Sequence, residues 1–379
     1  MKTNKLLILG LAIATLVFSN CTSSDESSSS NEVLSLGNVI KSNFSGKVVD
    51  INKQPISNAT IVMSGKTVTT NAAGQFTIND VSVREHFAYL TVSKSGFLNG
   101  SRTLFPHEGI NNATIMLLPE TVVATIQANQ SSEVTLPNST KVTFDGAFAL
   151  SSGTAYTGSV KVIMNHLDPA DANVFDKMPG NLIGTRTNGV ISGMETYGMI
   201  NVELKGANNE KLQLAAGHPA TISLPIAANQ MDTAEAKIPL WHFNETSGLW
   251  EEQGFAIREN NKYVGTVSHF SWWNADWAYE IATLNVLVKN FDDTPVNGVR
   301  VTISRASGST GDVLMDLGFT NSSGMLSSGV PRFEILTFRA YTPDGQLIST
   351  QVLPSSPDFV RNVVVIIPVN NRAAGNTKK

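Results

Sequence analysis

The sequence predicts an all-β protein made of tandem β-sandwich domains, and three observations lead to that prediction. Charged residues make up only 15% of the 379-residue chain, against a usual share of about a quarter. The chain holds 29 Gly and 15 Pro, which divide it into short segments. Within those segments apolar and polar residues alternate, as they do in strands with one buried face. We therefore expect transthyretin-like or Ig-like sandwiches and almost no helix after residue 40.

The N-terminus has the residue pattern of a targeting signal. Lys2 and Lys5 precede an apolar or small stretch over residues 6–18, and Cys21, the single cysteine of the chain, follows closely. A basic start and a short apolar stretch are typical of a signal peptide, because a membrane span needs about 20 apolar residues. The segment resembles the signal peptide of bacterial lipoproteins. This resemblance implies removal of residues 1–20 and lipidation of Cys21.

Residues 21–41 form a serine-rich segment that we expect to act as a flexible lipidated tether, because its first ten residues contain nothing apolar after the cysteine. Asn20 departs from the usual Gly or Ala before the cysteine and is similar to the relaxed boxes of Bacteroidetes lipoproteins. Asp25 and Glu26 resemble the signal that sends such lipoproteins to the cell surface. The expected location is therefore the outer membrane, with the cell surface favoured and the periplasmic face as the alternative.

The first predicted sandwich covers residues 42–119. Turn residues over 52–55 and 71–74 separate its alternating segments. Six strands are expected, at residues 44–49, 59–63, 67–70, 75–78, 88–92 and 113–117.

The first sandwich also carries a family resemblance. The segments GKVVDINKQPISNATIVMSGKTVTTNAAGQFTINDV and AYLTVSKSGF resemble a carboxypeptidase regulatory-like domain, a transthyretin-like sandwich. The resemblance is to the regulatory-like sandwich and implies a fold and no activity.

The same pattern returns near the C-terminus and predicts a second transthyretin-like sandwich over residues 281–370, followed by a disordered tail at 371–379. The segment LNVLVKNFDDTPVNGVRVTI repeats the first strand, the proline turn and the second strand. FTNSSGM then repeats the T-x-x-x-G element, and TFRAYTPDG repeats the next strand and its turn.

Residues 120–280 form a third, central β-domain. Strands are expected at residues 132–136, 141–144, 158–164, 198–204, 220–224 and 263–270, with helical turns only after Pro169 and around 275–279. The segments DPADANVFDKMPGNLIG, METYGMINVEL and IPLWHFNETSGLWEE resemble the ZU5-like domain of cartilage intermediate layer proteins.

Charge and composition exclude several functions. With 27 Lys and Arg against 31 Asp and Glu, the formal charge is −4, which disfavours nucleic acid as a partner. One cysteine allows neither an internal disulfide nor a cysteine zinc site. Asp168, Asp171 and Asp176, near His166, offer oxygen ligands for calcium, but their spacing favours a solvated loop. No catalytic motif is present, and we expect no enzyme, no metal and no cofactor.

Aromatic residues concentrate at the end of the central domain, where all five tryptophans lie between residues 241 and 277. We expect Trp241 and Trp250 to belong to a hairpin closed by residues 244–248. Trp272, Trp273 and Trp277 cannot all point inward from one strand, so at least one should be exposed or lie at a domain boundary. These three rings are a candidate binding surface.

His269, Phe270 and Ser271 at the expected end of the last central strand offer a second interpretation. Some ZU5-type domains cut their own backbone at an H-F-S sequence, and the resemblance implies Ser271 as nucleophile and His269 as base. A packing role for His269 is the favoured reading, because three residues are a weak signal.

The segment Asp232-Thr233-Ala234 resembles the O-glycosylation site of exported Bacteroidetes proteins and makes Thr233 a candidate for modification. Taken together, the sequence favours a non-catalytic, lipid-anchored surface protein that acts in binding, adhesion or scaffolding. Its partners are the membrane, through the anchor, and an unidentified protein or glycan. The alternatives are a self-processing surface protein and a glycan-binding accessory protein.

Overall fold

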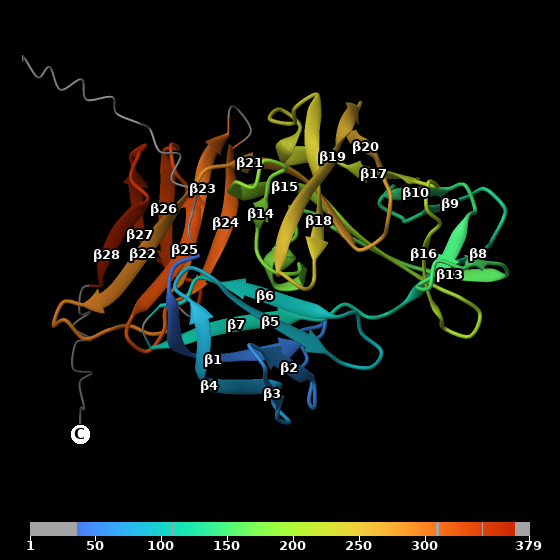
Figure 1. Cartoon of the computed structure of the whole chain (residues 1–379). Helices are drawn as coiled ribbons and strands as arrows, with labels where there is room; N and C mark the ends of the chain where they lie inside the picture. Colours follow the sequence, from blue (N-terminus) through green and yellow to red (C-terminus); the bar gives the residue numbers. More distant parts are fainter. Residues whose placement is uncertain (1–35, 108, 308–310, 343, 368–379) are drawn as a thin grey trace, which may run out of the picture. The chain divides into compact units, whose positions relative to one another are not determined.

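The computed structural model describes residues 36–107, 109–307, 311–342 and 344–367. The predicted signal peptide, Cys21 and the predicted tail at 371–379 lie outside these residues. All described residues belong to one compact unit, Val33–Lys379. Nearly every element in it is a strand (Figure 1), which confirms the all-β prediction.

The first sandwich, drawn in blue and cyan in Figure 1, begins three residues before the expected position 42. Its seven strands are β1 (Val39–Val49), β2 (Thr60–Met63), β3 (Lys66–Thr69), β4 (Gln75–Arg84), β5 (Ala88–Ser93), β6 (Gly100–Leu104) and β7 (Ile110–Met116). They form a three-stranded sheet, β4-β1-β7, and a four-stranded sheet, β3-β2-β5-β6. β1 and β7 are parallel, and the other pairs are antiparallel. The sequence pattern missed only β6, whose interior is Ser-Arg-Thr.

The second sandwich, in orange and red, repeats this arrangement. Its strands are β22 (Ile281–Asn290), β23 (Arg300–Ser307), β24 (Gly311–Phe319), β25 (Met325–Pro331), β26 (Leu336–Tyr341), β27 (Leu347–Leu353) and β28 (Val360–Ile367). The sheets are β25-β22-β28 and β24-β23-β26-β27, and β22 pairs with β28 in parallel. The two sandwiches therefore share one topology, as the sequence repeat predicts.

Between the sandwiches, fourteen strands of the central region hydrogen-bond into one sheet. They are β8 (Val122–Gln127), β9 (Ser132–Thr135), β10 (Lys141–Phe144), β11 (Phe148–Leu150), β12 (Ala155–Tyr156), β13 (Ser159–Leu167), β14 (Ile183–Thr185), β15 (Ile191–Lys205), β16 (Lys211–Leu214), β17 (Ala220–Pro225), β18 (Lys237–Asn244), β19 (Leu249–Glu259), β20 (Lys262–Val267) and β21 (Trp272–Tyr279). The main path is β12-β11-β16-β15-β21-β18-β19-β20-β17-β10-β9, with β13, β14 and β8 paired beside it.

Helical structure is limited to α1 (Val174–Lys177) and the 3-10 turn η1 (Ala228–Gln230) among the described residues. α1 lies where a helical turn was expected after Pro169. The second expected turn, at 275–279, is wrong, because these residues belong to β21. β21 is hydrogen-bonded to β15 on one side and β18 on the other, so pairing on both edges holds it extended. In the described part of the chain, no helix has the length and apolar character needed to cross a membrane.

Four buried apolar clusters stabilise the unit. One fills the first sandwich, one fills the second, and one large cluster occupies one face of the central sheet. The fourth contains Trp241, Trp250 and Trp272 of the central sheet together with Leu98 and Leu118 of the first sandwich region. Phe105, which follows β6, packs in the core of the second sandwich. Hydrophobic burial therefore continues across all three regions.

Candidate functional site

A cleft of about 760 Å³ opens over the outer face of the sheet β4-β1-β7. Because side chains alternate along a strand, the residues that face away from the sandwich core line its floor. These floor residues are polar: Ser45, Lys47, Gln75, Thr77, Asn112 and Thr114. Hydroxyls, amides and one ammonium group thus face the same open space. This set can exchange hydrogen bonds with a polar ligand but offers no nucleophile–base pair.

The walls of the cleft come from all three regions of the chain. Arg102 of β6 is 9% exposed, and its guanidinium donates to the carbonyl of Thr114 at 3.1 Å and to that of Gly180 at 3.4 Å. Phe175 of α1 lines a second side, and Phe319 of β24, which is 43% exposed, lines a third. The fixed arginine and the two rings give the polar cleft rigid, partly apolar walls.

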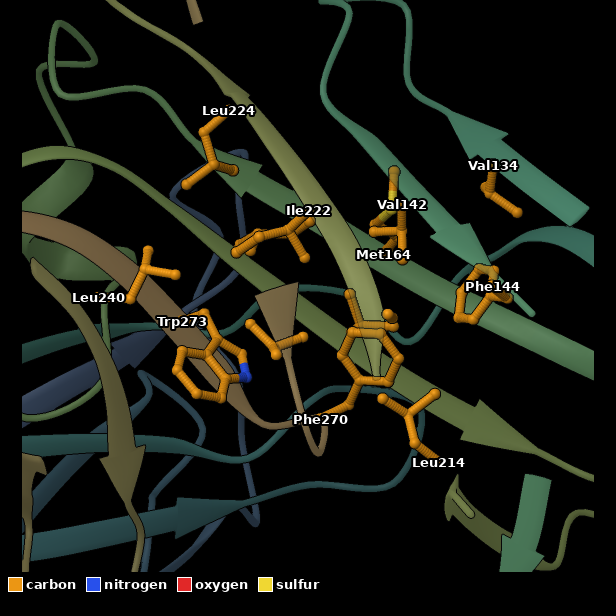
Figure 2. Close-up of a cluster of buried hydrophobic side chains, with 14 of the residues drawn as sticks. Val134, Val142, Phe144, Met164, Leu214, Ile222, Leu224, Leu240, Phe270 and Trp273 are labelled. Atoms are coloured by element: carbon orange, nitrogen blue, oxygen red, sulfur yellow. The ribbon is translucent and has the colours of Figure 1, made fainter. Parts of the chain in front are cut away.

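Trp272 and Trp273 are buried core residues. The prediction that Trp272, Trp273 and Trp277 form a binding surface is therefore wrong for these two. Trp272 is 3% exposed and packs with Trp241 and Trp250, whose hairpin forms as predicted. Trp273 is 1% exposed and points into the main core of the central sheet beside Leu240 (Figure 2). These buried rings form no exposed aromatic platform.

Trp277 differs from the other two rings of that strand. It is half-buried and packs against both the central core and the core of the second sandwich. This position agrees with the expectation that at least one of the three rings lies at a domain boundary. Its amphipathic ring fills the junction between the two cores.

His269, Phe270 and Ser271 lie in the connection between β20 and β21, because β20 ends earlier than expected, at Val267. The Ser271 hydroxyl donates to the carbonyl of Trp272 at 3.2 Å. The His269 ring packs against Trp273, with centroids 5.0 Å apart, and its Nε2 lies 3.2 Å from Oε1 of Gln253. The geometry therefore pairs the serine and the histidine with different partners.

The same connection is held by further hydrogen bonds. Gln213 binds both backbone groups of Phe270: its Nε2 donates to the carbonyl at 2.7 Å and its Oε1 accepts from the N–H at 2.8 Å. Burial, and then the neighbouring His242, lower the pKa of His269. None of the three described residues of the H-F-S segment has a positive φ. The arrangement supports the packing role of His269.

Thr233 lies in the connection between β17 and β18, just after the 3-10 turn η1. Its side chain is half-buried, and its hydroxyl donates to the carbonyl of Gln230 at 3.2 Å and lies 3.1 Å from the hydroxyl of Tyr197. A glycosyltransferase would have to displace these contacts. Glycosylation of Thr233 stays a prediction.

The acidic segment around α1 is organised by its own side chains. Asp168 accepts from the backbone N–H of Ala170 at 2.8 Å, and Asp171 forms an ion pair with Lys177. His166 accepts from Nδ2 of Asn138 at 2.8 Å through Nδ1, and its burial lowers its pKa. Within the described ranges no group of three His, Cys, Asp or Glu side chains converges as metal ligands.

Two features escaped the sequence analysis. The cleft joins residues from three distant segments, so no local pattern marks it. The second is a fully buried polar group on β21, Asn274 and Asp276. Both alternate with the apolar residues Trp273 and Ala275 on a strand buried on both faces. Polar residues at every second position of such an aromatic-rich strand are the signal that could have revealed the group.

The fold and the cleft define a multi-sandwich β-protein with a polar groove, and comparison with known proteins adds one relationship. No family model matches the chain. It is 25% identical to mouse cartilage intermediate layer protein 2 over 223 residues, which are 55% of this chain and 19% of that protein. It is 29% identical to the human protein 2 over 116 residues, which are 31% of this chain and 10% of that protein.

These relatives share a weak similarity with this chain, in line with the resemblance seen in the sequence, but the chain spans no more than a fifth of their length. Among solved structures, the Bacillus anthracis TIE protein covers 86% of this chain and 50% of its own, at 10% identity and a TM-score of 0.19. The major pilin SpaD of Corynebacterium diphtheriae covers 87% of this chain and 98% of its own, at 8% identity and a TM-score of 0.19. Scores this low support no inference about this chain.

Proposed function

We propose that the chain is a non-catalytic cell-envelope lipoprotein that works as a rigid surface scaffold and binds a protein or glycan ligand in the cleft. The observation that carries the proposal is the bonding between its β units. The hydroxyl of Tyr89 donates to the carbonyl of Glu245 at 2.9 Å, and that of Thr103 donates to the carbonyl of Gly248 at 2.8 Å. Tandem domains joined by flexible linkers lack such contacts, so these units suit a part that holds its ligand site in a fixed geometry.

The proposed site of lipid attachment is Cys21. The apolar stretch before it and the serine-rich segment after it support this assignment. A single acyl chain binds membranes only marginally, whereas the three chains of a bacterial lipoprotein hold firmly. Cells that produce the wild-type chain or Cys21→Ala are labelled with a clickable palmitate analogue and fractionated. Label and outer-membrane recovery should both be lost in the variant. Protease shaving of intact cells then separates the cell surface from the periplasmic face.

The binding role is tested in the cleft itself. Thr77→Arg places a long cation on the exposed floor, and Thr135→Arg on the edge strand β9 is the matched control. Purified proteins are applied to a polysaccharide array and to immobilised envelope extract. We expect Thr77→Arg to lose at least about tenfold in affinity, the cost of one misplaced charge in a polar site. Equal binding by wild type and both variants would show that the cleft is not the ligand site, and only the scaffold role would remain.

A further inference from the structure

Three buried polar side chains cross the junction of β15 and β21 in the middle of the central sheet. Thr196 lies opposite Asp276 in the antiparallel register, and Asn274 lies two residues before Asp276 on the same face of β21. Asn274 and Asp276 have no exposed surface, and Thr196 is 6% exposed. The strands around them supply aromatic and aliphatic packing, so this polar group sits in a dry environment.

The contacts within this group are short and ordered. The Thr196 hydroxyl donates to Oδ1 of Asn274 at 2.7 Å, and Nδ2 of Asn274 donates to Oδ2 of Asp276 at 2.6 Å. The backbone N–H of Gly198 donates to the Thr196 hydroxyl oxygen at 3.0 Å. That bond is possible because a bulge between Thr196 and Met199 turns the backbone, with Gly198 at φ +132°. A hydroxyl, a carboxamide and a carboxyl group thus form one continuous chain.

We propose that Thr196 and Asn274 become joined by an intramolecular ester, formed by attack of the threonine oxygen on the side-chain carbonyl carbon of asparagine, with Asp276 carrying the proton. The new bond links Oγ1 of Thr196 to Cγ of Asn274. The bond that breaks is Cγ–Nδ2, and the leaving group is ammonia. One alcohol and one primary amide give one ester and one ammonia, so no oxidant or reductant is required.

The environment supplies what this step needs. Complete burial raises the pKa of Asp276 well above its ordinary value, so the carboxyl group is a proton donor placed 2.6 Å from the leaving nitrogen. Asp276 gives its proton to Nδ2 as the C–N bond breaks and is restored by the proton from the threonine hydroxyl. The Gly198 N–H, which donates to the threonine oxygen at 3.0 Å, holds the attacking oxygen in place. Exclusion of water protects the ester from hydrolysis.

One further observation supports a chemical role for this group over a purely structural one. Oδ1 of Asp276 is buried and accepts no hydrogen bond of good geometry, although Thr196 interacts with this carboxyl group. A buried polar atom without a good partner costs about 1–3 kcal/mol, so it needs an explanation, and a role in chemistry is one. The proposed ester would link β15 covalently to β21, which is the strand that leads into the second sandwich.

Peptide mapping of the full-length protein tests the proposal directly. Complete tryptic digestion should place Thr196 in residues 187–205 and Asn274 in residues 263–289. With the ester present, the two peptides are recovered as one species whose mass is the sum of both minus about 17 Da, the mass of ammonia. Hydroxylamine at mild alkaline pH should separate them. Recovery of both peptides only as separate, unmodified species from wild-type protein overturns the proposal.

Variants identify the roles of the three residues. Thr196→Val keeps the side-chain shape without the hydroxyl, and Asp276→Asn keeps the shape without a transferable proton; both should give the two separate peptides. Thr196→Ser keeps a hydroxyl and should retain the linked species. Linked peptides in Thr196→Val would overturn the assignment of the nucleophile. The wild-type map decides the existence of the bond even if a variant does not fold.

Discussion

The turn after Thr70 in the first sandwich and the corresponding turn after Thr320 in the second differ in the burial of their first residue. Asn71 is exposed, but Asn321 is fully buried, and its Nδ2 lies 3.1 Å from Nδ1 of His107 in the first sandwich. The same local sequence therefore serves as a simple turn in one place and as a contact between sandwiches in the other.

The internal bonds of the two turns are nevertheless alike. The Thr70 hydroxyl accepts from the N–H of Ala59 at 2.8 Å and donates to the carbonyl of Ile56 at 2.7 Å. The Thr320 hydroxyl accepts from the N–H of Val299 at 3.0 Å and donates to the carbonyl of Val296 at 2.8 Å. Local sequence thus determines the conformation of the turn, while the rest of the chain determines what covers it.

The glycine that ends each turn shows the same equivalence. Gly74 has φ +70° and Gly324 has φ +71°. A Cβ atom at Gly74 would lie 2.5 Å from the carbonyl oxygen of Val48, and one at Gly324 would lie 2.2 Å from that of Val288. Both positions need glycine for the positive φ and for the close approach of backbone.

The largest expected effect tests whether the second sandwich depends on a side chain of the first sandwich region for its core. Phe105→Ala removes a ring that the first sandwich region places in the core of the second, and it should destabilise the protein by about 3–5 kcal/mol. Phe76→Ala is the matched control, because Phe76 is equally buried, at 4% exposure, in the first sandwich's own core. Urea unfolding followed by hydrogen exchange should show early opening of β22–β28 only in Phe105→Ala. If Phe105→Ala opened the first sandwich first instead, the second sandwich would not depend on Phe105.

A second pair of variants tests the equivalence of the turns. Thr70→Val and Thr320→Val keep the side-chain shape but leave one buried N–H and one buried carbonyl without their partner. Each should cost about 2 kcal/mol, since an unpaired buried group costs about 1–3 kcal/mol. Thr→Ser at the same positions restores the hydroxyl and should recover most of the loss. A large effect at one threonine and none at the other, measured by urea unfolding, would break the equivalence.

The pH dependence of stability should come from the central sheet and not from the difference between the sandwiches. Complete burial raises the pKa of Asp276, and partial burial raises the pKa of Glu203. Both residues lie in that sheet. The folded state then holds protons that the unfolded carboxyls, with pKa about 4, release. Stability should fall by up to about 1.4 kcal/mol per pH unit per group as pH rises above about 4, until the folded pKa is passed. Asp276→Asn should flatten the profile, and an unchanged slope would contradict the assignment.

A smaller effect separates the turn that begins with an exposed asparagine from the turn that begins with a buried one. Asn71→Ala and Asn321→Ala each remove a side-chain oxygen that accepts two backbone N–H bonds. Asn321→Ala should cost about 1 kcal/mol more, because it also leaves His107 without its buried partner. A double-mutant cycle with His107→Ala measures that coupling. Zero coupling energy would show that the contact between sandwiches adds nothing.

The smallest expected effect concerns the link between the central sheet and the second sandwich. Backbone cleavage before Ser271 would release residues 271–379 as a separate piece on a denaturing gel. We expect wild type and Ser271→Ala to run as the same full-length band after prolonged incubation, because Ser271 is bonded to the carbonyl of Trp272 and not to His269. A shorter band in wild type that Ser271→Ala abolishes would restore self-processing.

The sequence by itself determined the all-β class, the repeat of the two sandwiches and most strand positions in the first sandwich. These follow from side-chain alternation and from turn residues, which act over a few neighbours. The hairpin around Trp241 and Trp250 was predictable for the same reason. β6 escaped because its polar residues are buried against the central region. β21 was misread in part because its extended form depends on pairing with β15 and β18.

Only the tertiary structure decided which polar and aromatic residues meet. The cleft floor belongs to the first sandwich, but its walls also include residues of α1 and β24. Trp272 and Trp273 were candidates for a surface until packing on both faces of the central sheet buried them. Thr196 and Asn274 are 78 residues apart, yet the register of β15 and β21 brings their side chains within 2.7 Å. Contacts of this kind depend on sheet order and register, which are set by long-range pairing that no local pattern encodes.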